Sequence, residues 1–214
     1  MEVTSQNSDP EQSATIAHPA ASWLSGGAAL FSQTGGSTSR ALTPAAKRHL
    51  DDADGWLGLG DHVEAAEELG RIAPRLQTHP EVLHLRCRVY VAAEKWKMAV
   101  EMAHVIAKFV PGNSYGFVKL ACGLHELKRT KEARGVLLSI VERFPDDYLI
   151  RYNLACYECQ LGNLTEAHGW LLKARNLAGG EEIRFQALSD PDLEPMWSEI
   201  SRILTRDNPS ALYS

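Results

Sequence analysis

The phrase GNLTEAHGW, residues 162–170, has counterparts at regular distances earlier in the chain. The counterparts are GDHVEAAEE (60–68), EKWKMAVEM (94–102) and KRTKEARGV (128–136). Each phrase holds an alanine at the same place, so Ala65, Ala99, Ala133 and Ala167 follow one another at intervals of 34 residues. A fixed period of this length indicates a repeat protein in which every unit is one supersecondary element.

A second set of small residues stands twelve positions before these alanines. Its members are Ala53, Cys87, Ala121 and Ala155. After Pro44 the apolar residues recur at helical spacing, and no segment alternates with period two over a useful length. Antiparallel helices packed about 8–10 Å apart need small side chains where their backbones cross. The pattern therefore predicts an all-α stack of antiparallel helix pairs.

The 34-residue period, the small residues and the prolines that close two units, Pro111 and Pro145, resemble the tetratricopeptide repeat family. The resemblance covers about two thirds of the chain. It implies an α-solenoid over residues 44–181 with about four units, at 46–79, 80–113, 114–147 and 148–181. Two departures stand out. Pro74 falls inside the second helix expected for the first unit, and Gly179 replaces the closing proline of the fourth.

The two ends of the chain have a different composition from the repeats. Residues 1–43 are rich in Ser, Thr, Gln, Gly, Ala and Pro, which predicts a disordered tail. Four apolar residues in the tail are either isolated side chains or a short docking segment; they are Trp23, Leu24, Leu30 and Phe31.

After the repeats, residues 182–204 are expected to form capping helices and residues 205–214 to fray. Ile183, Phe185 and Leu188 are expected to cover the last repeat, and Pro195 to open a final helix.

Composition excludes several classes of protein. The net charge of −5 disfavours nucleic acid as a partner. The sequence lacks an apolar run long enough to span a membrane and the pattern of a signal peptide, so a cytoplasmic location without membrane contact is expected. Phosphate-binding and catalytic motifs are missing as well, which predicts a protein that is not an enzyme and uses no cofactor.

The resemblance also implies where a partner binds. In this family, fixed positions of the first helix of each unit line a concave groove that takes a peptide or protein. The candidate partner-binding residues at those positions are His84, Arg88, Tyr115, Val118, Cys122, His125, Leu149, Tyr152, Cys156 and Cys159. Lys47, Asp54 and Glu81 occupy equivalent positions in the first two units. Tyr and Arg are frequent anchors of protein interfaces.

The stretch CYEC, residues 156–159, allows another interpretation. Four potential ligands come from equivalent places on neighbouring first helices: Cys122, His125, Cys156 and Cys159. Three thiols and an imidazole are a possible zinc set, and the alternative function is a metal- or redox-responsive sensor. Against zinc, both pairs lie inside helices, where convergence on one ion is difficult. Reduced cysteines lining the groove are the simpler interpretation. Self-association is a further possibility.

Overall fold

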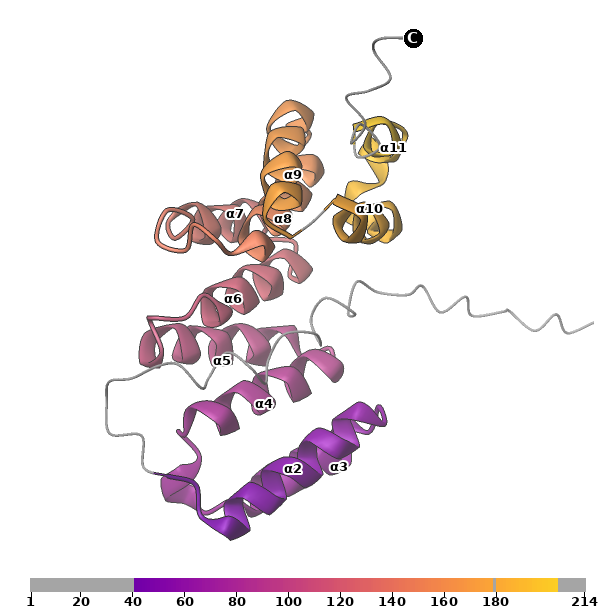
Figure 1. Cartoon of the computed structure of the whole chain (residues 1–214). Coiled ribbons are helices and arrows are strands. Elements are labelled where there is room, and N and C mark those ends of the chain that lie inside the picture. The colour runs from indigo at the N-terminus through magenta and orange to yellow at the C-terminus, as the bar shows by residue number, and fades with distance from the viewer. Residues whose placement is uncertain (1–40, 179, 204–214) are drawn as a thin grey trace, which may run out of the picture.

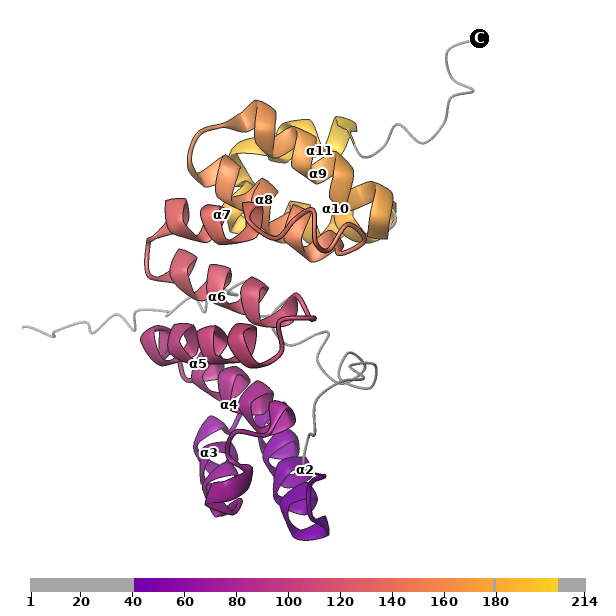
Figure 2. The ribbon, with the colours of Figure 1, turned by 90° about the vertical axis from the view of Figure 1, so that its left-hand side faces the viewer.

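Four helix pairs follow one another in the computed structural model, which describes residues 41–178 and 180–203. The pairs are α2 (Pro44–Gly58) with α3 (His62–Arg71), α4 (Pro80–Ala92) with α5 (Trp96–Phe109), α6 (Tyr115–Glu126) with α7 (Thr130–Leu138), and α8 (Tyr148–Gln160) with α9 (Leu164–Ala178). Figure 1 shows the pairs stacked in chain order, and Figure 2 shows the same stack from the side. No strand occurs in the described ranges. The predicted all-α solenoid of about four units is confirmed.

Shorter elements connect and close the stack. The 3-10 helix η2 (Pro74–Leu76) follows the first pair, and α10 (Gly180–Ser189), the 3-10 helix η3 (Pro191–Met196) and α11 (Trp197–Ile203) follow the last. We call α10, η3 and α11 together the cap. None of the described helices is long and apolar enough to cross a membrane.

Local sequence explains why several helices begin where they do. The Thr43 hydroxyl accepts a hydrogen bond from the backbone N–H of Ala46, at 3.2 Å. The Asp61 carboxylate accepts hydrogen bonds from two backbone N–H groups at the start of α3. The Asp147 carboxylate accepts one from the backbone N–H of Leu149 at the start of α8, at 2.9 Å. These side chains satisfy backbone donors that have no partner within the helix.

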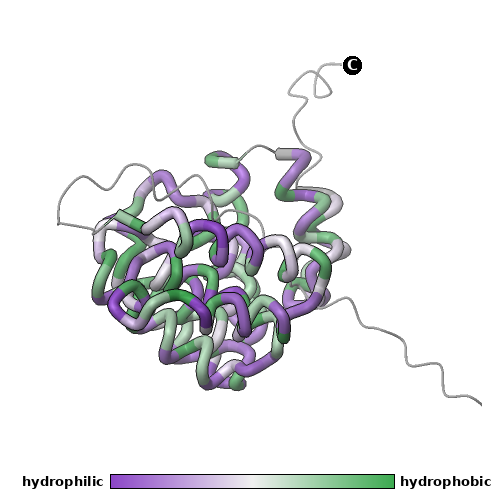
Figure 3. Tube along the Cα trace, turned by 90° about the horizontal axis from the view of Figure 1, so that it is seen from below, coloured by the Kyte–Doolittle hydropathy of each residue, from purple (hydrophilic) through white to green (hydrophobic). Residues whose placement is uncertain are grey.

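The helix crossings are packed as the small residues predict. All eight of the small residues are at most 1% exposed: Ala53, Ala65, Cys87, Ala99, Ala121, Ala133, Ala155 and Ala167. Figure 3 shows hydrophobic and hydrophilic residues alternating along the helical turns, as expected when one side of a helix faces a neighbour. Stacking the units in this way builds a core that one helix pair alone does not provide.

A left-handed residue ends the first helix of every unit. Gly60, Glu94, Lys128 and Gly162 have φ angles of 85°, 52°, 62° and 82° and are spaced 34 residues apart. The next residue in each unit donates a backbone hydrogen bond to the carbonyl five positions earlier, at 2.8–2.9 Å. This bond closes the helix in the manner of a Schellman motif. The sequence showed glycine at only two of the four places, whereas the structure shows one backbone turn at all of them.

Replacing the two non-glycine residues should therefore stabilise the protein. Glu94→Gly and Lys128→Gly are each expected to raise the free energy of unfolding by about 0.5–1 kcal/mol, because a side chain is strained at positive φ. Gly60→Ala is expected to lower it by a similar amount. Urea unfolding monitored by circular dichroism measures these changes in the free energy of unfolding.

Gly55→Ala is the matched control, because a Cβ at Gly55, within α2, meets nothing within 4 Å and the backbone there is helical. It should raise stability through helix propensity alone. A loss of stability in both Glu94→Gly and Lys128→Gly would contradict the account of the turns.

Three expectations about single residues are wrong. Pro74 does not lie inside the second helix of the first unit, because α3 ends at Arg71 and Pro74 opens η2. A proline has no N–H for the interior of a helix. Phe185 does not cover the last repeat but is 68% exposed, since Ile183 and Ala187, one turn apart, form the buried side of α10. Pro195 lies within η3, and the final helix begins at Trp197.

Candidate partner-binding site

The first helices of successive units share one face. Lys47 of α2 lies 3.7 Å from the carboxylate of Glu81 in α4, and Asp54 lies 2.6 Å from the guanidinium of Arg88. Both pairs join residues 34 positions apart, so α2 and α4 lie side by side in repeat register. We call the surface formed by α2, α4, α6 and α8 at these positions the A-face.

At its first two helices the A-face presents accessible charged groups. The side chains of Lys47 and Asp54 are 53% and 55% exposed, and that of Glu81 is 42% exposed. The Arg88 side chain is less exposed, at 18%. Exposed ion pairs of this kind contribute little to stability, so these side chains can exchange their partners at low cost.

Further along the A-face most of the expected contact residues are buried. Seven of the ten candidates are buried: His84, Tyr115, Val118, Cys122, Tyr152, Cys156 and Cys159. Arg88, His125 and Leu149 are partly exposed. All ten residues lie on the first helices of their units, and the sequence gave no sign of how deeply most of them are covered.

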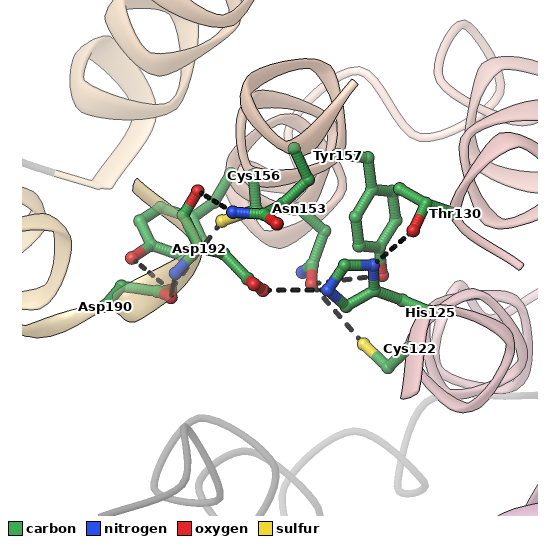
Figure 4. A network of polar contacts seen from close by, with 10 residues as sticks. Cys122, His125, Thr130, Asn153, Cys156, Tyr157, Asp190 and Asp192 are labelled. Atoms are coloured by element: carbon green, nitrogen blue, oxygen red, sulfur yellow. Dashed lines mark hydrogen bonds and ion pairs between the residues drawn. The ribbon is translucent and has the colours of Figure 1, made fainter. Parts of the chain in front are cut away.

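The cap occupies the far end of the A-face. The Tyr152 hydroxyl of α8 donates a hydrogen bond to the Asp190 carboxylate at 2.9 Å, and the Gln160 amide donates one to the backbone carbonyl of Asp192 at 2.8 Å. His125 of α6 lies 3.0 Å from the Asp192 carboxylate through its Nε2. Figure 4 shows His125, Asp190 and Asp192 in the network of polar contacts between α6, α8 and the cap. A segment of the chain itself is thus bound there by side chains of two first helices.

The bound segment is fixed by polar and apolar contacts together. Asp190 caps η3 by accepting the backbone N–H of Asp192 at 3.0 Å. Burial raises the pKa of the Asp190 carboxyl, and the hydrogen bond from Tyr152 opposes that rise. Leu193 and Met196 are no more than 1% exposed and belong to the core. The cap is therefore an integral part of the fold rather than a loosely docked segment.

Three of the four residues of the possible zinc set have other polar partners. The Cys122 thiol donates to the Asn153 side-chain oxygen at 3.4 Å, and the Cys156 thiol lies 3.6 Å from the Asp190 carboxylate. His125 contacts Thr130 at 2.9 Å as well as Asp192.

In the described part of the chain, two clusters bring three potential metal ligands within 4.8 Å of one another. They are His49, Asp52 and Glu68, and Cys156, Asp190 and Asp192. Neither contains Cys122, His125 or Cys159.

The cysteines lie in surroundings that disfavour the thiolate. Burial raises the pKa of the Cys87 thiol to about 12 and that of the Cys159 thiol to about 11, and it also raises the pKa values of Cys122 and Cys156. The carboxylates of Asp190 and Asp192 raise the pKa of Cys156 further. Because the thiolate is the reactive form, these sites do not favour redox chemistry.

Lys119 is a functional candidate that the sequence analysis did not single out. It follows Tyr115 by one helical turn, and its ammonium lies 5.4 Å from the centre of the Tyr115 ring. The His84 ring packs against the same tyrosine at an angle of 50° between the ring planes, with the ring centres 4.3 Å apart. Burial lowers the pKa of His84 to about 4, and the positive charges of Arg88 and Lys119 act in the same direction. The i, i+4 spacing from Tyr115 is the signal that would have identified Lys119.

The thiol environments give a direct prediction. The native protein should react slowly or not at all with a thiol reagent at pH 8, because all four cysteines are free but buried. Unfolding in guanidinium should release four reactive thiols. Ellman titration before and after unfolding counts the reactive thiols, and the unfolded chain serves as the control for the total number. Rapid reaction of Cys156 in the native protein would contradict the buried assignment.

Comparison with solved structures places the fold among tetratricopeptide repeat proteins. The structure matches "MamA 41-end from Desulfovibrio magneticus RS-1" with a TM-score of 0.58 and 20% identity, over 78% of this chain and 100% of that one. It also matches YrrB, a TPR protein with an unusual peptide-binding site, with a TM-score of 0.54 and 18% identity, over 78% of this chain and 90% of that one.

A third match is MamA from AMB-1, with a TM-score of 0.54 and 16% identity, over 79% of this chain and 97% of that one. No protein-family model and no curated protein matches the sequence. The similarity to these solved structures concerns the fold.

Proposed function

We propose that this protein is a non-enzymatic scaffold that binds a peptide or a segment of a protein partner on the A-face of its first three units. One observation carries the proposal. At the third and fourth units the same face already holds Asp190 and η3, through His125 of α6 and through Tyr152 and Gln160 of α8. This arrangement supports binding of a chain segment by side chains from adjacent first helices.

The fold supports this function in general terms. A stack of helix pairs offers an extended surface rather than a closed pocket from which water is excluded, and surfaces of this kind suit recognition more than catalysis. The YrrB structure, which shares the fold, is described as having a peptide-binding site. We expect a protein or peptide partner in the cytoplasm, and neither nucleic acid nor a cofactor.

The residues that we expect to meet the partner are the accessible ones. Lys47, Asp54, Glu81 and Arg88 present both signs of charge on two adjacent helices. The buried tyrosines and thiols lie further along the face, on α6 and α8. Arg88 is the strongest candidate anchor, because arginine is enriched at the energetic centres of interfaces.

Selection of binding peptides tests the proposal. A phage-displayed library of random peptides is panned against the full-length protein, and the peptides that emerge are synthesised with a fluorescent label. We expect Arg88→Ala and Asp54→Ala to weaken their binding about tenfold or more, as the loss of an interface anchor does. Fluorescence anisotropy gives the dissociation constants.

Lys97→Ala and Lys108→Ala on α5 are matched controls, since both residues are exposed on a second helix, away from the A-face. These variants should bind the selected peptides as the wild type does. The proposal would be refuted if the α5 variants weakened peptide binding equally. It would also be refuted if neither Arg88→Ala nor Asp54→Ala changed the dissociation constants.

A further inference from the structure

A group of three potential metal ligands lies between the two helices of the first unit. His49 and Asp52 belong to α2 and Glu68 belongs to α3, and their ligand atoms all lie within 4.8 Å of one another. The Nδ1 atom of His49 is 2.7 Å from Oε2 of Glu68. His49 and Asp52 are three residues apart and therefore share one side of α2. Two helices thus bring one imidazole and two carboxylates together.

The Glu68 carboxylate is buried and held in place by a neighbouring arginine. Glu68 is 8% exposed. Arg71, one turn further along α3, pairs with Oε1 of Glu68, and Oε2 is the atom that meets His49. Carboxylates that bind metal ions are commonly fixed by a second contact of this kind. Asp52 is exposed and His49 is partly exposed, so an ion can reach the group from solvent.

The polar group is peculiar to the first unit. At the places equivalent to His49 and Glu68, the second and third units have apolar residues: Leu83, Met102, Phe117 and Val136. These apolar residues belong to the core or pack against it. A repeat array is expected to be polar at its end, which accounts for the exposed Asp52.

The end of the array does not account for a carboxylate that is buried. Its charge must be matched to be stable there. Arg71 matches the charge at Oε1 of Glu68. A cation between Oε2 and His49 would do so at the other oxygen.

We propose that His49, Asp52 and Glu68 bind a divalent transition-metal ion, Zn²⁺ in particular, which joins α2 to α3. Zn²⁺ takes imidazole and carboxylate ligands, and many sites combine three protein ligands with one water. Its bonds to nitrogen and oxygen are about 2.0–2.2 Å long, so the ligand atoms of a tetrahedral site lie about 3.3–3.6 Å apart. His49 and Glu68 therefore need to separate by about 1 Å or less to admit the ion.

The site is separate from the proposed function. It lies within one helix pair, whereas the A-face is formed by the first helices of successive units. An ion that binds only the folded protein stabilises it, so Zn²⁺ fastens the first helix pair of the stack. Mg²⁺ and Ca²⁺ prefer oxygen ligands throughout and are not expected to compete.

Isothermal titration of the full-length protein with ZnCl₂ tests the proposal. The protein is dialysed against a chelator and then against chelator-free buffer at pH 7.5. We expect saturable binding of one Zn²⁺ ion per chain at the site. His49→Gln and Asp52→Asn should each weaken this binding about tenfold or more, because each removes a ligand. The glutamine amide can still donate a hydrogen bond to Glu68, so the helix pair should remain folded, which circular dichroism checks.

His104→Gln is the matched control, because His104 is an exposed histidine on α5 outside the group. Asp192→Asn addresses the other cluster of potential ligands, at the cap. Neither substitution should change the affinity for Zn²⁺. Loss of binding in Asp192→Asn but not in His49→Gln would place the ion at the cap and overturn the proposal.

Two further measurements report on the ligands and on the fold. Co²⁺ bound in place of Zn²⁺ should give visible absorption bands in the wild type and in His104→Gln, and these bands should be lost in His49→Gln. Excess Zn²⁺ should raise the midpoint of urea unfolding of the wild type but not that of His49→Gln. The proposal would be overturned if the wild type bound no Zn²⁺. It would also be overturned by an adventitious ion only, that is, by binding that is equally strong in the wild type, His49→Gln and Asp52→Asn.

Discussion

The close crossing of two helix backbones in every unit is the constraint on which the rest of the structure depends. Ala121 and Ala133, like their equivalents in the other units, are fully buried, and a larger side chain would separate the two helices. The left-handed turn that follows each first helix sends the chain back antiparallel, so that the two small residues meet. Repetition of this crossing at 34-residue intervals aligns the first helices and so creates the A-face.

The A-face has two parts with different roles. At α8 it is permanently filled by the cap, whose Leu193 and Met196 are as buried as any core residue. At α2 and α4 it presents exchangeable ion pairs such as Asp54–Arg88. The cap therefore ends the stack and covers the A-face at Tyr152 and Gln160 of α8 and at His125 of α6. A repeat array needs a terminal unit with a polar outer face, because that face meets water.

The sequence was sufficient for the fold because the period and the small residues are local signals. The turn geometry at Glu94 and Lys128 was harder to predict from the sequence, because the backbone there is left-handed although neither residue is a glycine. The environment of the candidate site was harder to predict from the sequence, because it depends on contacts between distant segments. Glu158 illustrates this: it is 1% exposed and lies 2.5 Å from Arg134 of the preceding unit, whereas sequence alone marks it only as a charge between two cysteines. Likewise, no pattern shows that Asp190 reaches Tyr152 across 38 positions.

The proposed function requires that a partner segment binds across the first helices of units one to three. Photo-crosslinking tests it most directly, with a selected peptide that carries a benzophenone group and mass spectrometry to locate the attachment sites on the full-length protein. The account predicts attachment to α2, α4 and α6 on the A-face. Attachment mainly to α3, α5 or α7, or at the cap in place of η3, would contradict it.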